Sequence, residues 1–223
     1  MRNKPALMIT CEHASNALPD FILRAFRDNA IPEDVLESHR GYDIGAYKVF
    51  SNLVKRLKPD FHCSGRFTRL VVDLNRSSTS KTFFSEYTIQ LPETVKRHAF
   101  DLWQKYREKI ESFVASIIPA RLRKAAKDTP LRIIHLGIHS FTPVLNGVER
   151  DADVGILYDP SRPAEATIAE ILIKNIRERE PGLKIRKNYP YLGKSDGLTT
   201  TLRQKFGPTY AGLEIEINQK LLK

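Results

Sequence analysis

Hydrophobic residues along the chain follow two patterns: short apolar runs rich in β-branched residues, and longer stretches in which apolar residues recur every three or four positions. The apolar runs predict buried strands at Ala6–Cys11, Phe67–Leu74, Leu131–Ile138, Val154–Tyr158, Leu183–Asn188 and Leu213–Ile217. The helical pattern predicts helices at Pro19–Arg27, Ile44–Leu57, Pro92–Ile118, Pro163–Glu178 and Leu198–Phe206. Strands that alternate with helices predict one α/β domain over residues 1–223, with a mostly parallel central sheet.

Composition agrees with one globular domain. The chain has 223 residues, of which 41% are hydrophobic, enough for a proper core. Its apolar runs are too short to span a bilayer, and the N-terminal residues do not resemble a signal peptide. Cys11 and Cys63 form neither a CxxC pair nor a disulfide framework. We therefore expect a reducing, cytoplasmic location and no membrane partner.

The formal net charge of +10 has three interpretations. The basic residues concentrate at positions 96–127 and 173–187, which also contain acidic residues, so solvated helix faces account for most of the charge. Nucleic-acid binding is the alternative, but no zinc-finger, helix-turn-helix or RNP pattern supports it. A positive field also favours a small anionic substrate. We expect such a substrate and no specific nucleic acid, and the sequence does not indicate an oligomeric state.

Chemically reactive residues follow the ends of several predicted strands. The carboxyl ends of parallel strands meet at one edge of a sheet, and sites of α/β proteins form there. The residues at these ends are Glu12, His13, Asn75, Arg76, His139 and Ser140. They are expected to come together.

His13 and His139 are the candidate metal ligands, because two histidines at one sheet edge with carboxylates nearby fit a zinc site. A catalytic zinc usually takes three protein ligands and leaves one position for water. The third ligand could be Glu12 or Asp43, and spacing alone does not choose between them.

Other residues have a structural interpretation. His135 is interpreted as a packed core histidine and Cys11 as a small core residue. Glu214 and Glu216 share one face of the last strand, which by itself is typical of an edge strand with a solvated face. The alternative is functional: a carboxylate beside a metal site can take a proton from water.

Two arginines are candidates for binding a substrate carboxylate. Arg76 and Arg150 follow segments rich in turn residues, and a guanidinium group can hold a carboxylate with two hydrogen bonds. Each could equally form a surface ion pair.

Eight short motifs extend over nearly the whole chain: CEHASN at 11–16, HRGYDIGA at 39–46, TRLVVDLNR at 68–76, HSFTP at 139–143, GVER at 147–150, DVGIL at 153–157, NYPY at 188–191 and LEIE at 213–216. In their sequence and order, these motifs resemble those of the N-formylglutamate amidohydrolase family. The resemblance implies a metal-dependent hydrolase on a three-layer α/β domain, similar to zinc exopeptidases and phosphorylase/hydrolase-like folds. The family's named reaction converts N-formyl-L-glutamate to formate and glutamate.

The resemblance also implies a ligand set. His13 and His139 match the metal-site histidines, which would hold one zinc ion per chain. Related exopeptidases have a His-x-x-Glu spacing after the first strand, whereas the residue three positions after His13 is Asn16. We therefore expect Asp43 to be the third ligand and Glu12 to orient an imidazole.

The expected mechanism places Glu216 as the base that accepts a proton from a metal-activated water, with Glu12 taking that role if the last strand does not supply it. Arg76 and Arg150 would hold the substrate carboxylates. Asn75 and Ser140 are expected to contact the substrate beside them. Two alternatives remain: a peptidase or cell-wall amidase of the same fold, and a non-catalytic basic protein that binds anions or nucleic acid.

Overall fold

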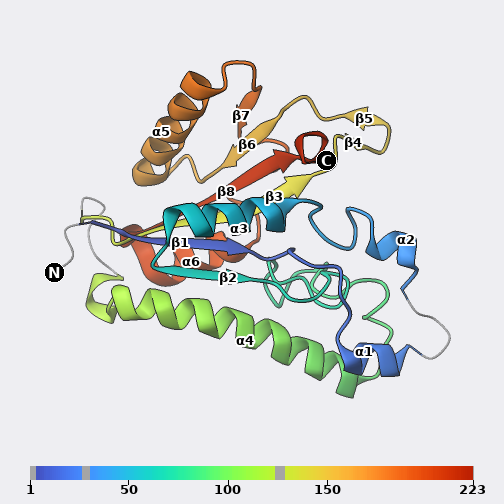
Figure 1. The fold of residues 1–223 in the computed structure, drawn as a ribbon. Coiled ribbons are helices and arrows are strands. Elements are labelled where there is room, and N and C mark those ends of the chain that lie inside the picture. Colours follow the sequence, from blue (N-terminus) through green and yellow to red (C-terminus); the bar gives the residue numbers. More distant parts are fainter. Residues whose placement is uncertain (1–3, 27–30, 124–128, 223) are drawn as a thin grey trace.

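The computed structural model describes residues 4–26, 31–123 and 129–222 and has a central sheet with helices on both faces (Figure 1). Its strand order is β2-β1-β3-β8-β6-β7. The first four strands in this order run parallel, β6 is antiparallel to β8, and β7 is parallel to β6. The strands are β1 (Ala6–Cys11), β2 (Phe61–Ser64), β3 (Ile133–Phe141), β6 (Val154–Leu157), β7 (Ile185–Lys187) and β8 (Tyr210–Asn218). The predicted α/β class with a mostly parallel sheet is confirmed.

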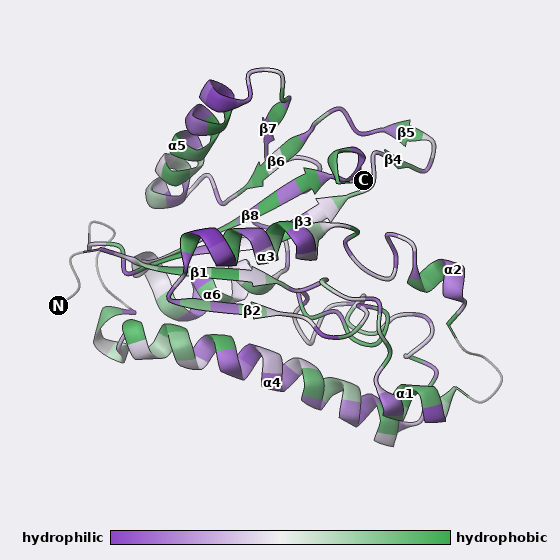
Figure 2. Cartoon of the chain, in the orientation of Figure 1, coloured by the Kyte–Doolittle hydropathy of each residue, from purple (hydrophilic) through white to green (hydrophobic). Residues whose placement is uncertain are grey.

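The helices form a layer on each face of the sheet. They are α1 (Asp20–Ala25), α2 (Glu33–Leu36), α3 (Ala46–Leu57), α4 (Glu93–Ile117), α5 (Pro163–Arg179) and α6 (Leu198–Phe206). Helices α4 and α6 pack on one face with Met8 and Tyr210, whereas α3 and α5 pack on the other with Ile9 and Leu213. Figure 2 shows the mixed bands of hydrophobic and hydrophilic residues along α3 and α4 that this one-sided packing requires.

The predicted helices are confirmed with small shifts at their ends. Pro92 immediately precedes α4 and Pro163 is the first residue of α5. Proline is tolerated at the start of a helix because a backbone N–H there would have no acceptor within the helix. Helix α6 has the predicted bounds, and Gly207 follows it with a positive φ of 69°, which favours glycine. The predicted end of the first helix, Arg27, lies outside the described residues.

The strand predicted at Phe67–Leu74 is wrong. This segment forms consecutive turns, and the strand that pairs with β1 is the preceding β2. Leu70 and its apolar neighbours are buried against α4 rather than paired in a sheet. The Leu70 carbonyl accepts hydrogen bonds from the hydroxyls of Ser85 and Thr88 instead of a strand neighbour. The apolar content of this segment therefore reflects burial and not strand pairing.

The edge-strand interpretation of the last strand is also wrong. Strand β8 lies between β3 and β6, so it is internal to the sheet, and Glu216 is only 5% exposed. Antiparallel pairing with β6 covers the side that we expected to be free. Because Glu216 is buried and Glu214 is half-buried, the face that carries them is not a solvated surface.

A small hairpin lies between β3 and β6 in the chain. Strands β4 (Val144–Leu145) and β5 (Val148–Glu149) are joined by Asn146 and Gly147, both at positive φ, as a tight hairpin turn requires.

Most charged side chains of α4 are exposed, as predicted, but Arg107 is buried and donates to the Arg76 carbonyl. Residues 124–127 of the predicted basic segment lie outside the described part. Within that part, every helix is too short or too polar to cross a bilayer.

Candidate metal and catalytic site

A polar cavity of about 210 Å3 lies at the carboxyl ends of the central parallel strands. The residue pairs His139–Glu216 and Gly137–Glu214 are neighbours across β3 and β8, so both glutamates share the sheet face of His139. The cavity brings together nearly all the predicted site residues, which are His13, Asp43, Asn75, Arg76, His139, Ser140, Arg150 and Glu216. Glu12 is not in its lining but contacts His139, which is.

His13, Asp43 and His139 form a buried cluster whose ligand atoms lie within 4.8 Å of one another. Asp43 Oδ2 lies 2.9 Å from Nδ1 of His139 and 3.5 Å from Nδ1 of His13. Two ligands of a tetrahedral zinc ion stand about 3.3 Å apart, given bonds of about 2.0–2.1 Å. The backbone N–H of Asp43 donates to the His13 carbonyl at 2.9 Å, which fixes the loop before α3 against the end of β1. These three residues could hold a metal ion.

Each histidine of the cluster has a carboxylate on its other ring nitrogen. Nε2 of His13 is hydrogen-bonded to Asp73 Oδ1 at 2.7 Å. Nε2 of His139 lies 3.0 Å from Glu12 Oε2, at hydrogen-bond distance but out of line for a well-directed bond. The hydroxyl of Tyr106 donates to the second Glu12 oxygen at 2.9 Å. Carboxylates placed in this way orient metal-binding imidazoles and leave Nδ1 available.

The charges around His139 favour a cation between the carboxylates of Asp43 and Glu12. Burial lowers the pKa of His139, but the hydrogen bonds and charges of Asp43 and Glu12 outweigh it and hold the pKa well above its ordinary value. Burial raises the pKa of Glu12, yet the close contact with His139 and the charge of that imidazole bring it down to about 2. Burial also raises the pKa of Asp43, and its bond to His139 offsets this only in part. A proton on His139 supplies the positive charge that these two carboxylates favour, and a divalent metal would supply it as well.

Arg69 is a site residue that the sequence did not identify. Its Nη2 donates to Asp43 Oδ1 at 2.9 Å and contacts Nδ1 of His13. The guanidinium group thus places positive charge beside the candidate metal ligands. Burial lowers the pKa of Arg69, although the carboxylates of Asp73 and Glu216 oppose this. Arg69 lies in the TRLVVDLNR motif at 68–76. A strand over this segment does not predict that the Arg69 side chain points into the site.

The two glutamates of β8 differ in their partners. Thr199 donates to Glu214 Oε1 at 3.0 Å, whereas Glu216 Oε2 has no hydrogen-bond partner among the described residues. Burial raises the pKa of Glu216 to about 8, with the charge of His139 opposing the shift and that of Asp43 adding to it. A buried carboxylate with a free oxygen and a raised pKa suits proton transfer near neutral pH.

The predicted substrate-binding residues differ in how many hydrogen-bonding groups they have free for a substrate. Arg76 donates to the Asp196 carbonyl at 2.5 Å, and Arg150 donates to the Tyr191 hydroxyl at 3.1 Å, so both keep further N–H groups. The Asn75 carbonyl oxygen accepts from the backbone of Leu198 at 2.8 Å, which leaves its NH2 group available.

Ser140 is more fully engaged than the other three. Its hydroxyl donates to the Ile44 carbonyl at 2.8 Å and accepts from Gln219 at 3.2 Å. Its backbone N–H points to Asp43 Oδ2 at 3.3 Å. These contacts favour a role in positioning Asp43 over direct contact with a substrate.

His135 and Cys11 are core residues, as predicted. His135 is fully buried and hydrogen-bonded on both nitrogens, to Thr10 at 2.8 Å and to Tyr210 at 2.6 Å. Burial lowers its pKa to about 4. Cys11 is buried in the cluster beneath α3, and burial raises the pKa of its thiol.

Fold and site together define an α/β protein with a buried cluster of two histidines and one carboxylate at a small polar cavity. Residues 6–223 match the family described as N-formylglutamate amidohydrolase, and the chain belongs to this family. The family is one of hydrolases that act on an amide, as the sequence motifs predicted.

A solved structure and the curated proteins give a further comparison. The fold is similar to the crystal structure of the gene product Atu2144 from Agrobacterium tumefaciens, with a TM-score of 0.73 and 28% sequence identity. The similarity covers 98% of this chain and 82% of that chain. No curated protein is significantly similar to the chain.

Proposed function

We propose that this protein is a metal-dependent amidohydrolase that cleaves the amide of an N-acylated acidic amino acid such as N-formyl-L-glutamate. The observation that carries the proposal is the convergence of His13, Asp43 and His139 beside Glu216 in a cavity that Arg76 and Arg150 also line. Family membership supports amide hydrolysis, and the two arginines support an anionic substrate. We propose further that the chain is one domain related to zinc exopeptidases, and that the protein is cytoplasmic.

The donor set fits a divalent metal of the zinc type. Two imidazole nitrogens and one carboxylate oxygen are ligands that catalytic zinc takes, with a further position open. The same atoms already contact a positive group, because Arg69 approaches both Asp43 and His13. Metal binding therefore requires the Arg69 guanidinium to turn away from His13. When bound, the metal would polarise the amide carbonyl and make water more acidic.

The chain's own residues supply the remaining steps of the proposed reaction. Arg76 and Arg150 bind the substrate carboxylates and orient the amide. Glu216 takes a proton from the attacking water and passes it to the leaving nitrogen. Arg69, once turned from His13, is placed to stabilise the negative charge that develops on the carbonyl oxygen. Glu12 and Asp73 keep the two imidazoles in place.

The direct test measures formate release from N-formyl-L-glutamate by the purified protein, before and after a chelator and after addition of Zn2+. We expect formate release that the chelator abolishes and Zn2+ restores. N-formyl-L-leucine is the matched substrate with a neutral side chain and should react more slowly. Activity confined to peptides or cell-wall fragments would replace this substrate with that of a peptidase or amidase. Tight nucleic-acid binding without hydrolysis would contradict the proposal altogether.

A further inference from the structure

A second cavity, of about 260 Å3, lies between α4 and the segment that follows β2. Its lining is mainly apolar and includes Phe67, Val71, Leu74 and Leu102. The candidate metal ligands His13, Asp43 and His139 are not in its lining. The cavity is therefore separate from the candidate active site.

Three basic residues also line this apolar cavity. They are Arg66, on the segment after β2, and Lys105 and Lys109, one helical turn apart on α4; all three are exposed. Among the described residues, no carboxylate forms an ion pair with any of the three. The ammonium group of Lys109 instead lies 5.9 Å from the ring centre of Phe61. The nearby Glu108 accepts a hydrogen bond from Gln104 at 2.7 Å and is not within ion-pair distance of Lys105 or Lys109.

An apolar cavity with unneutralised cations at its edge is complementary to one class of ligand. The apolar walls exclude a fully hydrated anion such as phosphate, and the cations disfavour an amine. A carboxylate with a hydrocarbon chain satisfies both parts, because the chain buries apolar surface while the carboxylate pairs with the lysines. The modest volume suits a short ligand, since pockets for larger molecules are roughly 300–1,000 Å3.

We propose that this cavity binds a medium-chain aliphatic carboxylate, with its chain against Leu74 and Leu102 and its carboxylate at Lys105 and Lys109. Tyr106 is part of the cavity wall and also donates to Glu12, so the bound chain contacts the side chain that holds Glu12. Tyr106 thus links this cavity to Glu12, which lies beside the candidate metal ligand His139. The proposal does not depend on the hydrolase activity, because it concerns binding alone.

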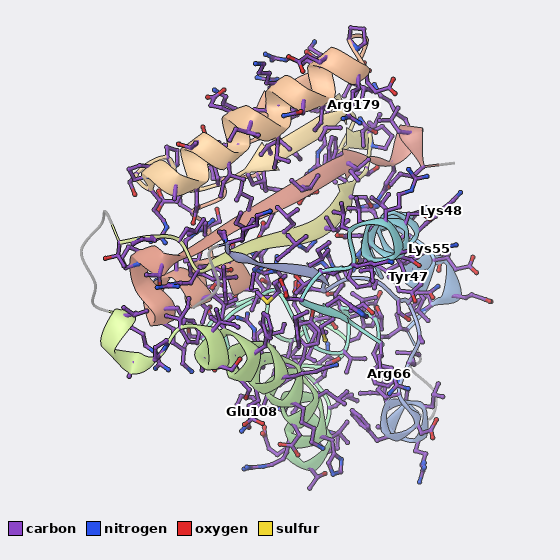
Figure 3. The ribbon with its side chains drawn as sticks, turned by 60° about the vertical axis from the view of Figure 1, so that its left-hand side comes forward. Tyr47, Lys48, Lys55, Arg66, Glu108 and Arg179 are labelled. Carbon is purple, nitrogen blue, oxygen red and sulfur yellow. The ribbon has the colours of Figure 1, made fainter. Side chains whose placement is uncertain are left out.

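The test is calorimetric titration of the full chain with octanoate, below the concentration at which octanoate forms micelles. We expect saturable binding at one site, weakened at least tenfold in the Lys105→Ala/Lys109→Ala variant. The matched control is Lys48→Ala/Lys55→Ala, which removes two exposed lysines from α3 (Figure 3) and should bind octanoate as the unaltered protein does. Both pairs are exposed, so neither change disturbs the core.

A ligand series tests the chemistry of the cavity. Each methylene should change affinity by about fourfold, so butanoate should bind far more weakly than octanoate. Octylamine should not bind. Absence of saturable octanoate binding, equal loss in the two lysine variants, or unchanged binding in Lys105→Ala/Lys109→Ala would overturn the proposal. The last outcome would place the anion at the arginines of the candidate active site instead.

Discussion

Glu12 and His13 are adjacent in the sequence, but Glu12 pairs with the other histidine of the site: Glu12 Oε2 lies 3.0 Å from Nε2 of His139, while His13 Nε2 is bonded to Asp73. This arrangement explains why a carboxylate and an imidazole stand together at the end of β1. Successive side chains of a strand point to opposite sides, and the backbone turns after Cys11, where Gly65 donates to its carbonyl. Glu12 thus reaches across to β3 rather than sharing a metal ligand set with its neighbour.

Replacing Glu12 should weaken metal binding without removing a ligand. Glu12→Gln keeps the size of the side chain but loses the charge that holds His139, so we expect about 10–100-fold lower metal affinity. Asp43→Ala should cost more, because it removes a ligand atom. The measurement is competition for Zn2+ with a chromogenic chelator, and Glu108→Gln on the exposed face of α4 is the control (Figure 3). A greater loss for Glu12→Gln than for Asp43→Ala would make Glu12 the ligand.

Glu216 should carry the proton transfer. Glu216→Gln keeps the shape but cannot accept a proton, so turnover of N-formyl-L-glutamate should fall by about 10²–10⁴-fold with metal content unchanged. Glu214→Gln, one pleat earlier and already bonded to Thr199, is the matched control and should keep most activity. If the Glu214 variant were dead and the Glu216 variant active, the base would be Glu214. Full activity in both would move the role to Glu12.

Arg76 should set the preference for acidic substrates. Arg76→Lys keeps the charge but loses the planar pair of donors, so we expect about tenfold or greater loss of kcat/KM on N-formyl-L-glutamate. The loss on N-formyl-L-leucine should be smaller, because that substrate lacks the second carboxylate. Equal kcat/KM of the unaltered protein on both substrates would contradict a carboxylate clamp.

His135 should make the fold sensitive to acid. Its pKa is about 4 in the folded chain against 6.5 for a free histidine, so the unfolded chain binds more protons between these pH values. The free energy of unfolding should therefore fall as pH falls from 6.5 to 4, by up to about 3 kcal/mol from this residue. Urea unfolding at several pH values should show a shallower fall for His135→Gln. Identical pH dependence in the two proteins would be the contrary result.

The sequence predicted most of the strand-helix order and that His13 and His139 lie at the same edge of the sheet, because both depend on local patterns: β1 and β3 end in recognisable polar residues. It did not predict Arg69 and Asp73 as partners of Asp43 and His13. Those contacts join residues 26 and 60 positions apart, and spacing along the chain does not encode them.

The error at Phe67–Leu74 has a related cause. A buried run of turns and a buried strand have the same composition, so apolar content alone could not separate them. The sequence of β8 likewise did not show whether the strand is at an edge of the sheet or internal, because its internal position depends on antiparallel pairing with β6. Sheet order, and with it the burial of Glu216, depends on contacts between distant segments.

Metal stoichiometry tests the central claim most directly. We expect the purified protein, loaded with Zn2+ and freed of excess, to hold one ion per chain by elemental analysis. The His13→Ala/His139→Ala variant should lose most of that metal while its circular dichroism spectrum is unchanged, and His62→Ala, an exposed histidine of β2, should keep it. One zinc ion retained per chain by the folded His13→Ala/His139→Ala variant would contradict the account.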